Sequence, residues 1–317
     1  MATLAQLDRR DRAILAQLDR DCRQSNADIA RRLRLGKHVV SYRIAQLEKA
    51  GVISKYYTLI DMSKVGRQSY RLYLKFLPLR EEERRAVFDY LVKSPATWFV
   101  GEMDGEWDAG FVLWTRDHYE FERFWSGFAE KFQKCVEKSN LSVYLRDHFY
   151  TLGFLGTDSE ARQEYVIGRG GSADVDEKDR RILDAVAENA RRGTMEIAKR
   201  TSLTPVQVAY RLKKLVKEGV ISAFRASISL EGLTVYKVNF HLSSMEKKQE
   251  MLEFAKGEKW TVYVDESVGM ADFEWDLVCP SYTELKDSVE RFKRTFFKHI
   301  RKYDFQIYGR FLKERFF

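Results

Sequence analysis

The chain has 317 residues, 44% of them hydrophobic and 14% aromatic, which excludes a disordered protein and allows roughly two to four domains. Three scattered cysteines, Cys22, Cys135 and Cys279, exclude a disulfide framework and form no metal-binding spacing. No stretch approaches the roughly 18 apolar residues of a membrane span, and no apolar leader follows Met1, so we expect a cytoplasmic protein that does not contact membranes.

The formal net charge of +8 is concentrated in two segments. Residues 1–64 hold 13 Lys and Arg against 7 Asp and Glu, and residues 175–233 hold 12 against 8. These balances of +6 and +4 exceed the total, so the rest of the chain is slightly acidic. The distribution favours an anionic partner, most commonly nucleic acid, although a solvated basic surface would give the same count.

The first segment, residues 1–64, predicts three short helices followed by a hairpin. Asp8 is placed to cap the first helix, and apolar residues recur at spacings of three and four in all three. The third helix is predicted over residues 37–49. Gly51 follows it, and a glycine in this position commonly adopts the left-handed conformation that ends a helix. Residues 52–60 are rich in β-branched and aromatic side chains and predict a strand.

The second segment, residues 65–155, predicts the order β-α-β-β-α-β, which is the ferredoxin-like arrangement. Alternation from Tyr70 to Phe76 predicts a half-buried strand with Arg71 on its polar side. A charged helix over 81–93 and a hairpin around Asp104-Gly105 follow. A second helix, with phenylalanines spaced three and four apart, then precedes a last strand.

The chain repeats itself at an offset of 168 residues. Of the 60 positions from Leu7 to Gly66, 20 are identical when laid on Val175 to Thr234. The same offset pairs residues 106–108 with 274–276, so we expect a second helical segment over 175–233 and a second ferredoxin-like segment over 234–317. The glycine-rich stretch over 156–174 is typical of a flexible tether. We expect the two ferredoxin-like domains to pack sheet against sheet as an intrachain pseudo-dimer that can associate further.

Three helices followed by a hairpin describe a winged helix-turn-helix, in which the third helix enters the major groove of DNA. The alternative is that its polar residues are only the solvent face of a surface helix. Arg43 and Arg211 are left open between phosphate contact and an ion pair inside the domain. The other candidate DNA-binding residues are Lys37, His38, Ser41, Tyr42 and Gln46 in the first copy and Gln207, Tyr210, Lys213 and Lys214 in the second.

The pattern Leu-x4-Val-x2-Arg-(Ile/Leu)-x2-Leu-x3-Gly-Val-Ile, at Leu35 to Ile53 and again at Leu203 to Ile221, resembles the recognition-helix signature of the Lrp/AsnC family of transcriptional regulators. The β-α-β-β-α-β segments resemble its ligand-sensing domain, called RAM. The resemblance implies an α+β fold, a tandem repeat of winged helix-turn-helix and RAM units, and sequence-specific binding of double-stranded DNA modulated by a small-molecule effector. Three departures are the duplication within one chain, Gly36 in place of a capping serine, and a stretched motif in which Gly101 and Gly269 each precede an aspartate by seven residues.

The family places its effector pocket near a glycine followed by an aspartate. The resemblance transfers an effector-binding role to seven residues, with core packing as the favoured alternative for the two tryptophans: Gly101, Glu102, Trp107 and Asp108, and Gly269, Trp275 and Asp276.

The five histidines form no metal-binding spacing and no phosphate-binding glycine loop is present, so we expect no enzyme, no cofactor, no metal and no catalytic residue. One alternative is enzymatic, since sirohaem decarboxylases resemble the same architecture in paired or fused copies and need histidines and arginines around a tetrapyrrole. Their clustered histidine motif is not visible, and residues 145–148 and 309–311 are the nearest candidates. A pure interaction protein is a third alternative, against which the basic charge of both copies argues.

Overall fold

The computed structural model describes residues 2–156 and 162–315. Residues 157–161, which begin the predicted linker, lie outside the described residues, as do Met1 and residues 316–317 at the ends of the first and last predicted domains. Within the described ranges, no helix is long and apolar enough to cross a membrane.

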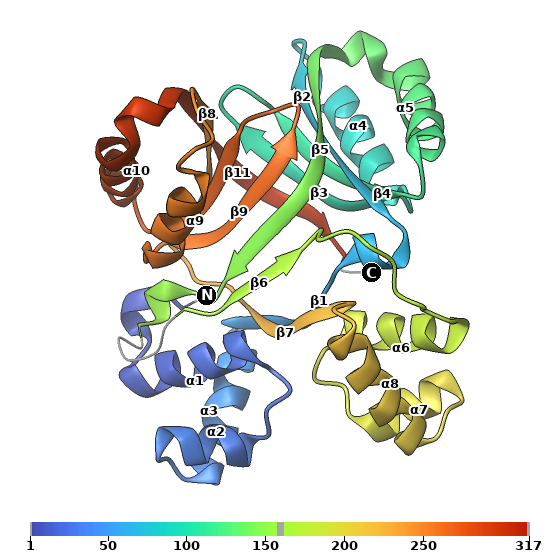
Figure 1. Cartoon of the computed structure of the whole chain (residues 1–317), viewed down its shortest axis with the longest axis vertical. Helices are drawn as coiled ribbons and strands as arrows, with labels where there is room; N and C mark the ends of the chain where they lie inside the picture. Colours follow the sequence, from blue (N-terminus) through green and yellow to red (C-terminus); the bar gives the residue numbers. More distant parts are fainter. Residues whose placement is uncertain (1, 157–161, 316–317) are drawn as a thin grey trace.

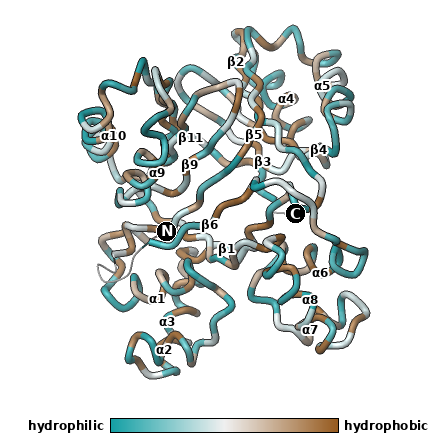
Figure 2. Tube along the Cα trace, in the orientation of Figure 1, coloured by the Kyte–Doolittle hydropathy of each residue, from teal (hydrophilic) through white to brown (hydrophobic). Residues whose placement is uncertain are grey.

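Each unit begins with a head of three helices, as predicted. Aspartates cap the first helix of each head, where Asp8 accepts from the Asp11 amide and Asp176 from the Asp179 amide. In Figure 2 the helices of both heads alternate between hydrophilic and hydrophobic segments, as helices that bury one face do. The head helices are α1 (Arg9–Arg20), α2 (Asn26–Leu33) and α3 (Lys37–Lys49) in the first unit, and α6 (Glu177–Glu188), α7 (Thr194–Thr201) and α8 (Pro205–Lys217) in the second.

The hairpin expected after each third helix forms between the two units. Strand β1 (Ile53–Ile60) follows α3, strand β7 (Ile221–Ile228) follows α8, and the two pair antiparallel in a two-stranded ribbon. Each head therefore contributes one strand, and the ribbon joins the two heads on the same side of the molecule (Figure 1).

Both ferredoxin-like domains have the predicted β-α-β-β-α-β order. Residues 106–108 lie in the turn between two strands, so the second strand of the first hairpin starts later than predicted. The first domain comprises β2 (Gln68–Phe76), α4 (Glu81–Lys93), β3 (Thr97–Asp104), β4 (Ala109–Thr115), α5 (His118–Phe132) and β5 (Val136–Tyr150). The second comprises β8 (Thr234–Leu242), α9 (Lys248–Gly257), β9 (Thr261–Val268), β10 (Phe273–Cys279), α10 (Tyr282–Phe296) and β11 (Ile300–Glu314).

The two sheets face each other and are also hydrogen-bonded along both edges. β5 pairs with β2 of its own domain and with β9 of the other, and β11 pairs with β8 and with β3. Each of these long strands has 15 residues. The ring β2-β4-β3-β11-β8-β10-β9-β5 therefore closes into a barrel, with α4 and α5 outside one half and α9 and α10 outside the other (Figure 1).

The offset of 168 does not extend through the second half of each unit. His118 begins α5 and Tyr282 begins α10, a difference of 164, and the same difference separates Ala109 at the start of β4 from Phe273 at the start of β10. Trp107 therefore has no structural equivalence to Trp275, and the pairing of 106–108 with 274–276 was wrong.

The expectation of a flexible tether was also wrong for its described part. Strand β6 (Glu164–Ile167) adds to β5 in antiparallel register. Arg162 is half-buried just before it and donates to three carbonyl groups of the second unit: Lys256 at 2.9 Å, Glu258 at 2.6 Å and Thr261 at 2.5 Å. The Tyr165 hydroxyl donates to the Arg20 carbonyl at 2.6 Å. Hydrogen bonds thus fix the linker against both units.

The heads cross over between the units. The apolar core of the first head, with Ile14 and Ile44, is continuous with that of the second ferredoxin-like domain, with Phe240 and Trp275. The core of the second head instead includes Met62 of the first unit. Figure 1 shows the same arrangement, with α1 below α9 and α6 below α4 and α5.

Candidate functional site

The third helices of the two heads begin differently. Gly36 precedes α3 without a side-chain cap. In contrast, the Thr204 hydroxyl accepts from the Gln207 amide at 3.2 Å, and the Gln207 side chain accepts in return from the Thr204 amide at 2.9 Å. This capping box, with Pro205 at the first helical position, makes α8 the more firmly started helix. The side-chain amide oxygen Oε1 of Gln207 is therefore already bonded to the Thr204 amide.

One arginine in each head holds the third helix against the first helix. Arg43 lies 2.8 Å from Asp8 and 2.7 Å from Asp11, and Arg211 lies 2.8 Å from Asp176 and 2.7 Å from Asp179. Of the two roles that the sequence left open for Arg43 and Arg211, the structure shows the ion pair inside each head. Lys214 is drawn into the same cluster, 3.3 Å from Asp179.

The outer faces of α3 and α8 carry most of the remaining candidates. Tyr42 and Tyr210, which are equivalent in the repeat, are 66% and 70% exposed. Ser41 is half-buried and accepts a hydrogen bond from Asn26 at 3.0 Å. The residues that stay exposed beside the tyrosines are Lys37, His38 and Gln46 on α3 and Gln207 and Lys213 on α8.

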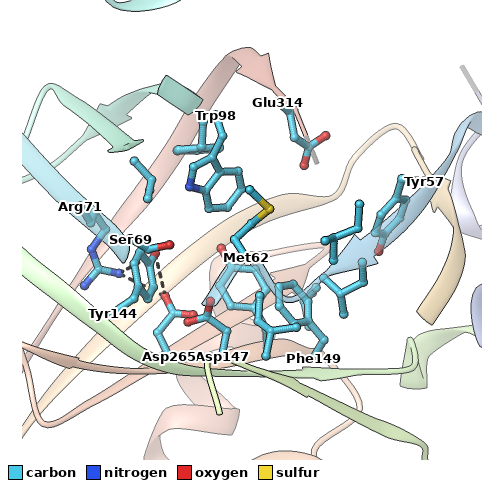
Figure 3. Close-up of a pocket in the computed structure, with 18 of the residues that line it drawn as sticks. Tyr57, Met62, Ser69, Arg71, Trp98, Tyr144, Asp147, Phe149, Asp265 and Glu314 are labelled. Atoms are coloured by element: carbon cyan, nitrogen blue, oxygen red, sulfur yellow. Dashed lines mark hydrogen bonds and ion pairs between the residues drawn. The ribbon is translucent and has the colours of Figure 1, made fainter. Parts of the chain in front are cut away.

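A cavity of about 590 Å³ lies between the ribbon and one end of the barrel. β1 and β7 form its wall on the side of the heads, and strands β2, β4, β5 and β9 form the opposite wall. Its apolar lining includes Met62, Phe149 and Trp98, and the Trp98 ring stacks on Trp114 with centroids 5.0 Å apart (Figure 3). The size suits a small organic ligand.

None of the seven residues assigned to effector binding lines this cavity. In the first unit, Trp107 stacks on Tyr73 with ring centroids 5.9 Å apart. Asp108 accepts from Lys75 at 2.9 Å and from the Phe76 amide at 2.7 Å. Gly101 lies in β3, where an added Cβ would stand 3.0 Å from the Phe99 ring.

The remaining four have structural contacts of their own. Glu102 pairs with Arg310 at 2.9 Å. Gly269, with φ +111°, turns the second hairpin. Trp275 is in the core, and its ring nitrogen donates to Thr261 at 2.8 Å. Asp276 accepts from buried Lys237 at 2.6 Å. Trp107 and Trp275 thus both have the packing role that the sequence favoured.

One end of the cavity reaches a buried charge network inside the barrel. Arg71 pairs with Glu274 and lies 3.1 Å from Asp265. Lys237 lies 2.7 Å from the same Asp265 and 2.6 Å from Asp276. Arg71 and Lys237 are the fourth residues of β2 and β8, so the two domains contribute equivalent cations. The sequence placed Arg71 on the polar side of a half-buried strand, whereas barrel closure buries both faces.

Asp147 on β5 adds a further carboxyl group to this end. Figure 3 shows it beside Asp265, with Arg71 and Tyr144 to the left of the two aspartates. Burial raises the pKa of Asp147 well above its usual range, and the neighbouring Asp265 raises it further. Burial also raises the pKa of Asp276, to about 7. The sequence analysis missed this network. The available signal was a cation at the same position of two equivalent strands, Arg71 in β2 and Lys237 in β8.

Comparison with known proteins supports the assignment of both heads. A winged helix-turn-helix DNA-binding model matches residues 7–54, and an AsnC-type helix-turn-helix domain model matches residues 175–216. An uncharacterized HTH-type transcriptional regulator of Pyrococcus abyssi is 35% identical over 121 residues, which cover 38% of this chain and 74% of that protein. The LysM regulator of Sulfurisphaera tokodaii is 33% identical over 85 residues, or 26% of this chain and 61% of that protein.

A solved structure matches the architecture of nearly the whole chain. The sirohaem decarboxylase NirDL, in complex with an iron-uroporphyrin III analogue, superposes with a TM-score of 0.66 and 15% identity, covering 96% of this chain and 92% of that one. The prediction that the chain is not an enzyme is therefore wrong, because the fold that matches the full length is that of an enzyme. At this identity the likeness concerns the fold alone.

Proposed function

Because the chain belongs to the Lrp/AsnC family of helix-turn-helix transcriptional regulators, we propose that it binds double-stranded DNA through the exposed faces of α3 and α8 and responds to a ligand in the central cavity. The observation that carries the proposal is the exposure of Tyr42 and Tyr210 at equivalent positions of the two helices. A large aromatic side chain kept exposed in both copies is suited to pack against a DNA backbone, and its hydroxyl can bond to a phosphate.

The surrounding residues give each helix its own chemistry. Lys37 on α3 and Lys213 on α8 supply charge for phosphates, and His38 and Gln46 offer groups that can bond to base edges. Val206 on α8 is an apolar contact instead. We therefore propose that the two heads read different half-sites, so that the preferred operator is not a perfect palindrome.

The ion pairs of Arg43 and Arg211 with aspartates fix the orientation of α3 and α8 in their heads. Arg43 and Arg211 are satisfied by aspartates of their own heads, so in this proposal they orient the third helices rather than contact DNA. The ribbon of β1 and β7 couples the heads, and because it also walls the cavity, a bound ligand would act on the spacing of the heads.

Selection from a random DNA pool, followed by gel shifts across salt concentrations, tests this function. We expect an asymmetric site and an affinity that falls steeply with salt, because basic side chains displace condensed counterions. Tyr42→Ala and Tyr210→Ala should weaken binding, while Lys93→Ala, an exposed lysine on α4 outside the two heads, should not. The absence of any enriched sequence, or affinity that ignores salt, would contradict the proposal.

A second candidate, tetrapyrrole decarboxylation, is favoured by the whole-chain likeness to NirDL and by the cavity. Two arginines at the cavity, Arg67 and Arg146, could pair with tetrapyrrole carboxylates, since Arg146 is 57% exposed and lies 3.6 Å from its acidic partner Glu266. Addition of iron-uroporphyrin III to the full chain, followed by absorption spectroscopy and product mass, tests this candidate. Release of carbon dioxide from the bound tetrapyrrole would establish it, and an unchanged spectrum would exclude it.

A further inference from the structure

We propose that the ligand of the central cavity is a flat organic cation, whose amidinium or ammonium group sits on Asp147. The inference deepens the proposed function, in which the cavity is the effector site, by naming the chemical class of the ligand. It depends on the charges at the polar end of the cavity, on polar atoms there that lack a partner, and on the aromatic walls.

Carboxyl groups outnumber cations at this end. Arg71 and Lys237 face four carboxyl groups, those of Asp147, Asp265, Glu274 and Asp276. Arg71 is engaged by Glu274 and Asp265, and Lys237 by Asp265 and Asp276. The four carboxyl groups exceed the two cations by two. Among the described residues no cation lies within ion-pair distance of Asp147, so its carboxyl group has to be neutralised by a proton or by a ligand.

Three buried polar atoms of cavity-lining residues also lack partners within the described residues: the donor Nε1 of Trp98 and two oxygens. The hydroxyl of Tyr73, a cavity-lining residue that is only 1% exposed, makes no hydrogen bond within the described residues, and neither does Oδ1 of Asp147. Buried polar atoms of this kind are costly unless a ligand or water satisfies them. An amidinium presents several N–H donors in one plane, and both oxygens can accept from it.

The walls suit a flat, positively charged body. Phe149 lies next to Asp147 and Trp98 lies across the cavity from it, while Tyr57 lines the far end of the same cavity (Figure 3). Aromatic faces attract cations, most strongly where water is excluded. A ligand that carried carboxylates into this end would instead meet the excess of acidic groups, which like-charge repulsion disfavours.

Binding exchanges one positive charge for another. The ligand cation enters, and the proton that neutralises Asp147 leaves to solvent, so the charge of the network is unchanged. Affinity should therefore rise with pH as Asp147 loses its proton. The titratable and charged groups that face Asp147 are Asp265 from β9, Arg71 from β2, Tyr144 from its own strand β5, Lys237 from β8 and Asp276 from β10.

The test uses three matched probes on the full chain: 2-naphthamidine, the neutral 2-naphthamide and the anionic 2-naphthoate. Titration calorimetry in two buffers of different ionisation enthalpy should show that the amidine binds at least about tenfold more tightly than the others and releases protons. Asp147→Asn keeps the shape but cannot carry the charge, and it should lose at least about tenfold in affinity for the amidine. Trp98→Leu should weaken the amidine more than the amide.

Equal binding of the three probes, or an unchanged affinity in Asp147→Asn, would overturn the inference. So would tighter binding of iron-uroporphyrin III than of the amidine at the same cavity, judged by displacement. Gel shifts without any probe, run on the same preparation, separate the two proposals. If the protein binds DNA but not the amidine, the proposed ligand class is refuted and the proposed regulator function is not.

Discussion

Arg225 on the ribbon and Asp19 on α1 form a buried ion pair between the two units. The guanidinium Nη2 lies 2.5 Å from Asp19 Oδ1, and both side chains are almost completely buried. The second oxygen of Asp19 accepts from the Leu152 amide at 2.7 Å, and Arg225 also donates to the Tyr150 carbonyl at 2.9 Å. One carboxylate therefore ties the first head to the ribbon and to the end of β5.

Asp19→Asn should leave the Arg225 charge buried without its partner. Breaking a buried pair from one side costs about 3–5 kcal/mol, so we expect that loss in the free energy of unfolding measured with urea. The exposed Asp89→Asn should change it by less than about 0.5 kcal/mol. Equal stabilities of the two variants would show that the pair does not anchor the head.

Lys37→Ala and Arg43→Ala should affect DNA binding in different ways. Lys37→Ala removes a phosphate contact, so affinity should fall uniformly across sequences and the salt slope should decrease by about 1. Arg43→Ala instead releases Asp8 and Asp11, which should cost stability of roughly 1 kcal/mol and leave the salt slope unchanged. Gel shifts across salt together with urea unfolding distinguish the two, and a reduced salt slope for Arg43→Ala would assign it to the DNA.

Gly36→Ser should stabilise the first head. Gly36 has φ −71° and ψ 140°, which any residue adopts, and an added Cβ would meet Val39 at an ordinary 3.7 Å. A capping hydroxyl and a less flexible unfolded chain should together add about 0.5–1 kcal/mol. Thr204→Gly in the second head is the reverse change and should lower stability. Thermal unfolding measures both, and no gain for Gly36→Ser would mean that α3 starts well without a cap.

Stability should depend on pH through His148, which bridges Glu164 of the linker strand at 2.8 Å and Glu266 of β9 at 2.9 Å. Burial disfavours the charged ring, but hydrogen bonds to Glu266 and Glu164 outweigh it and raise the pKa of His148. The stabilisation is therefore complete below the unfolded value of about 6.5 and is lost as pH rises through the raised folded value. Urea unfolding across pH 6 to 9 should show this decline.

His148→Gln should remove most of that dependence, while the exposed His118→Gln should keep it. Hydrogen exchange should also show faster opening of residues 164–167 in His148→Gln, because the bridge to the linker is weakened. A pH profile that is identical in the wild type and His148→Gln would place the dependence elsewhere.

Local patterns in the sequence predicted much of the fold. Residues 37–49 and 81–93 form helices with the predicted bounds, because helical periodicity and capping act within a few residues. Contacts between the two units could not be predicted from the sequence in this way. The closure of the barrel through β5 and β11 depends on pairing between strands far apart in the chain, which no local signal carries.

The same distinction between local patterns and long-range contacts applies to the candidate sites. Exposed faces of α3 and α8 follow from helical spacing, whereas the cavity requires knowledge of which strands meet. The constant offset of 168 aligned Trp107 with Trp275, because the shift of four residues in the second half of each unit is invisible without structure. The effector assignment followed the family's glycine and aspartate motif and so did not reach Arg71 and Asp265. The linker was misjudged because its glycines suggested flexibility, while the anchoring contacts come from a few side chains, chiefly those of Arg162 and Tyr165.

The crossing of the heads has an evolutionary consequence. After a gene duplication, two copies can usually drift apart independently. Here the first head shares its core with the second ferredoxin-like domain. The effect of a substitution at Ile14 or Ile44 on packing therefore depends on side chains encoded more than half a gene away. Compensating changes should therefore link the first sixth of the reading frame to its last quarter, and the second head to the first unit. Selection acts on this duplicated gene as one inseparable locus.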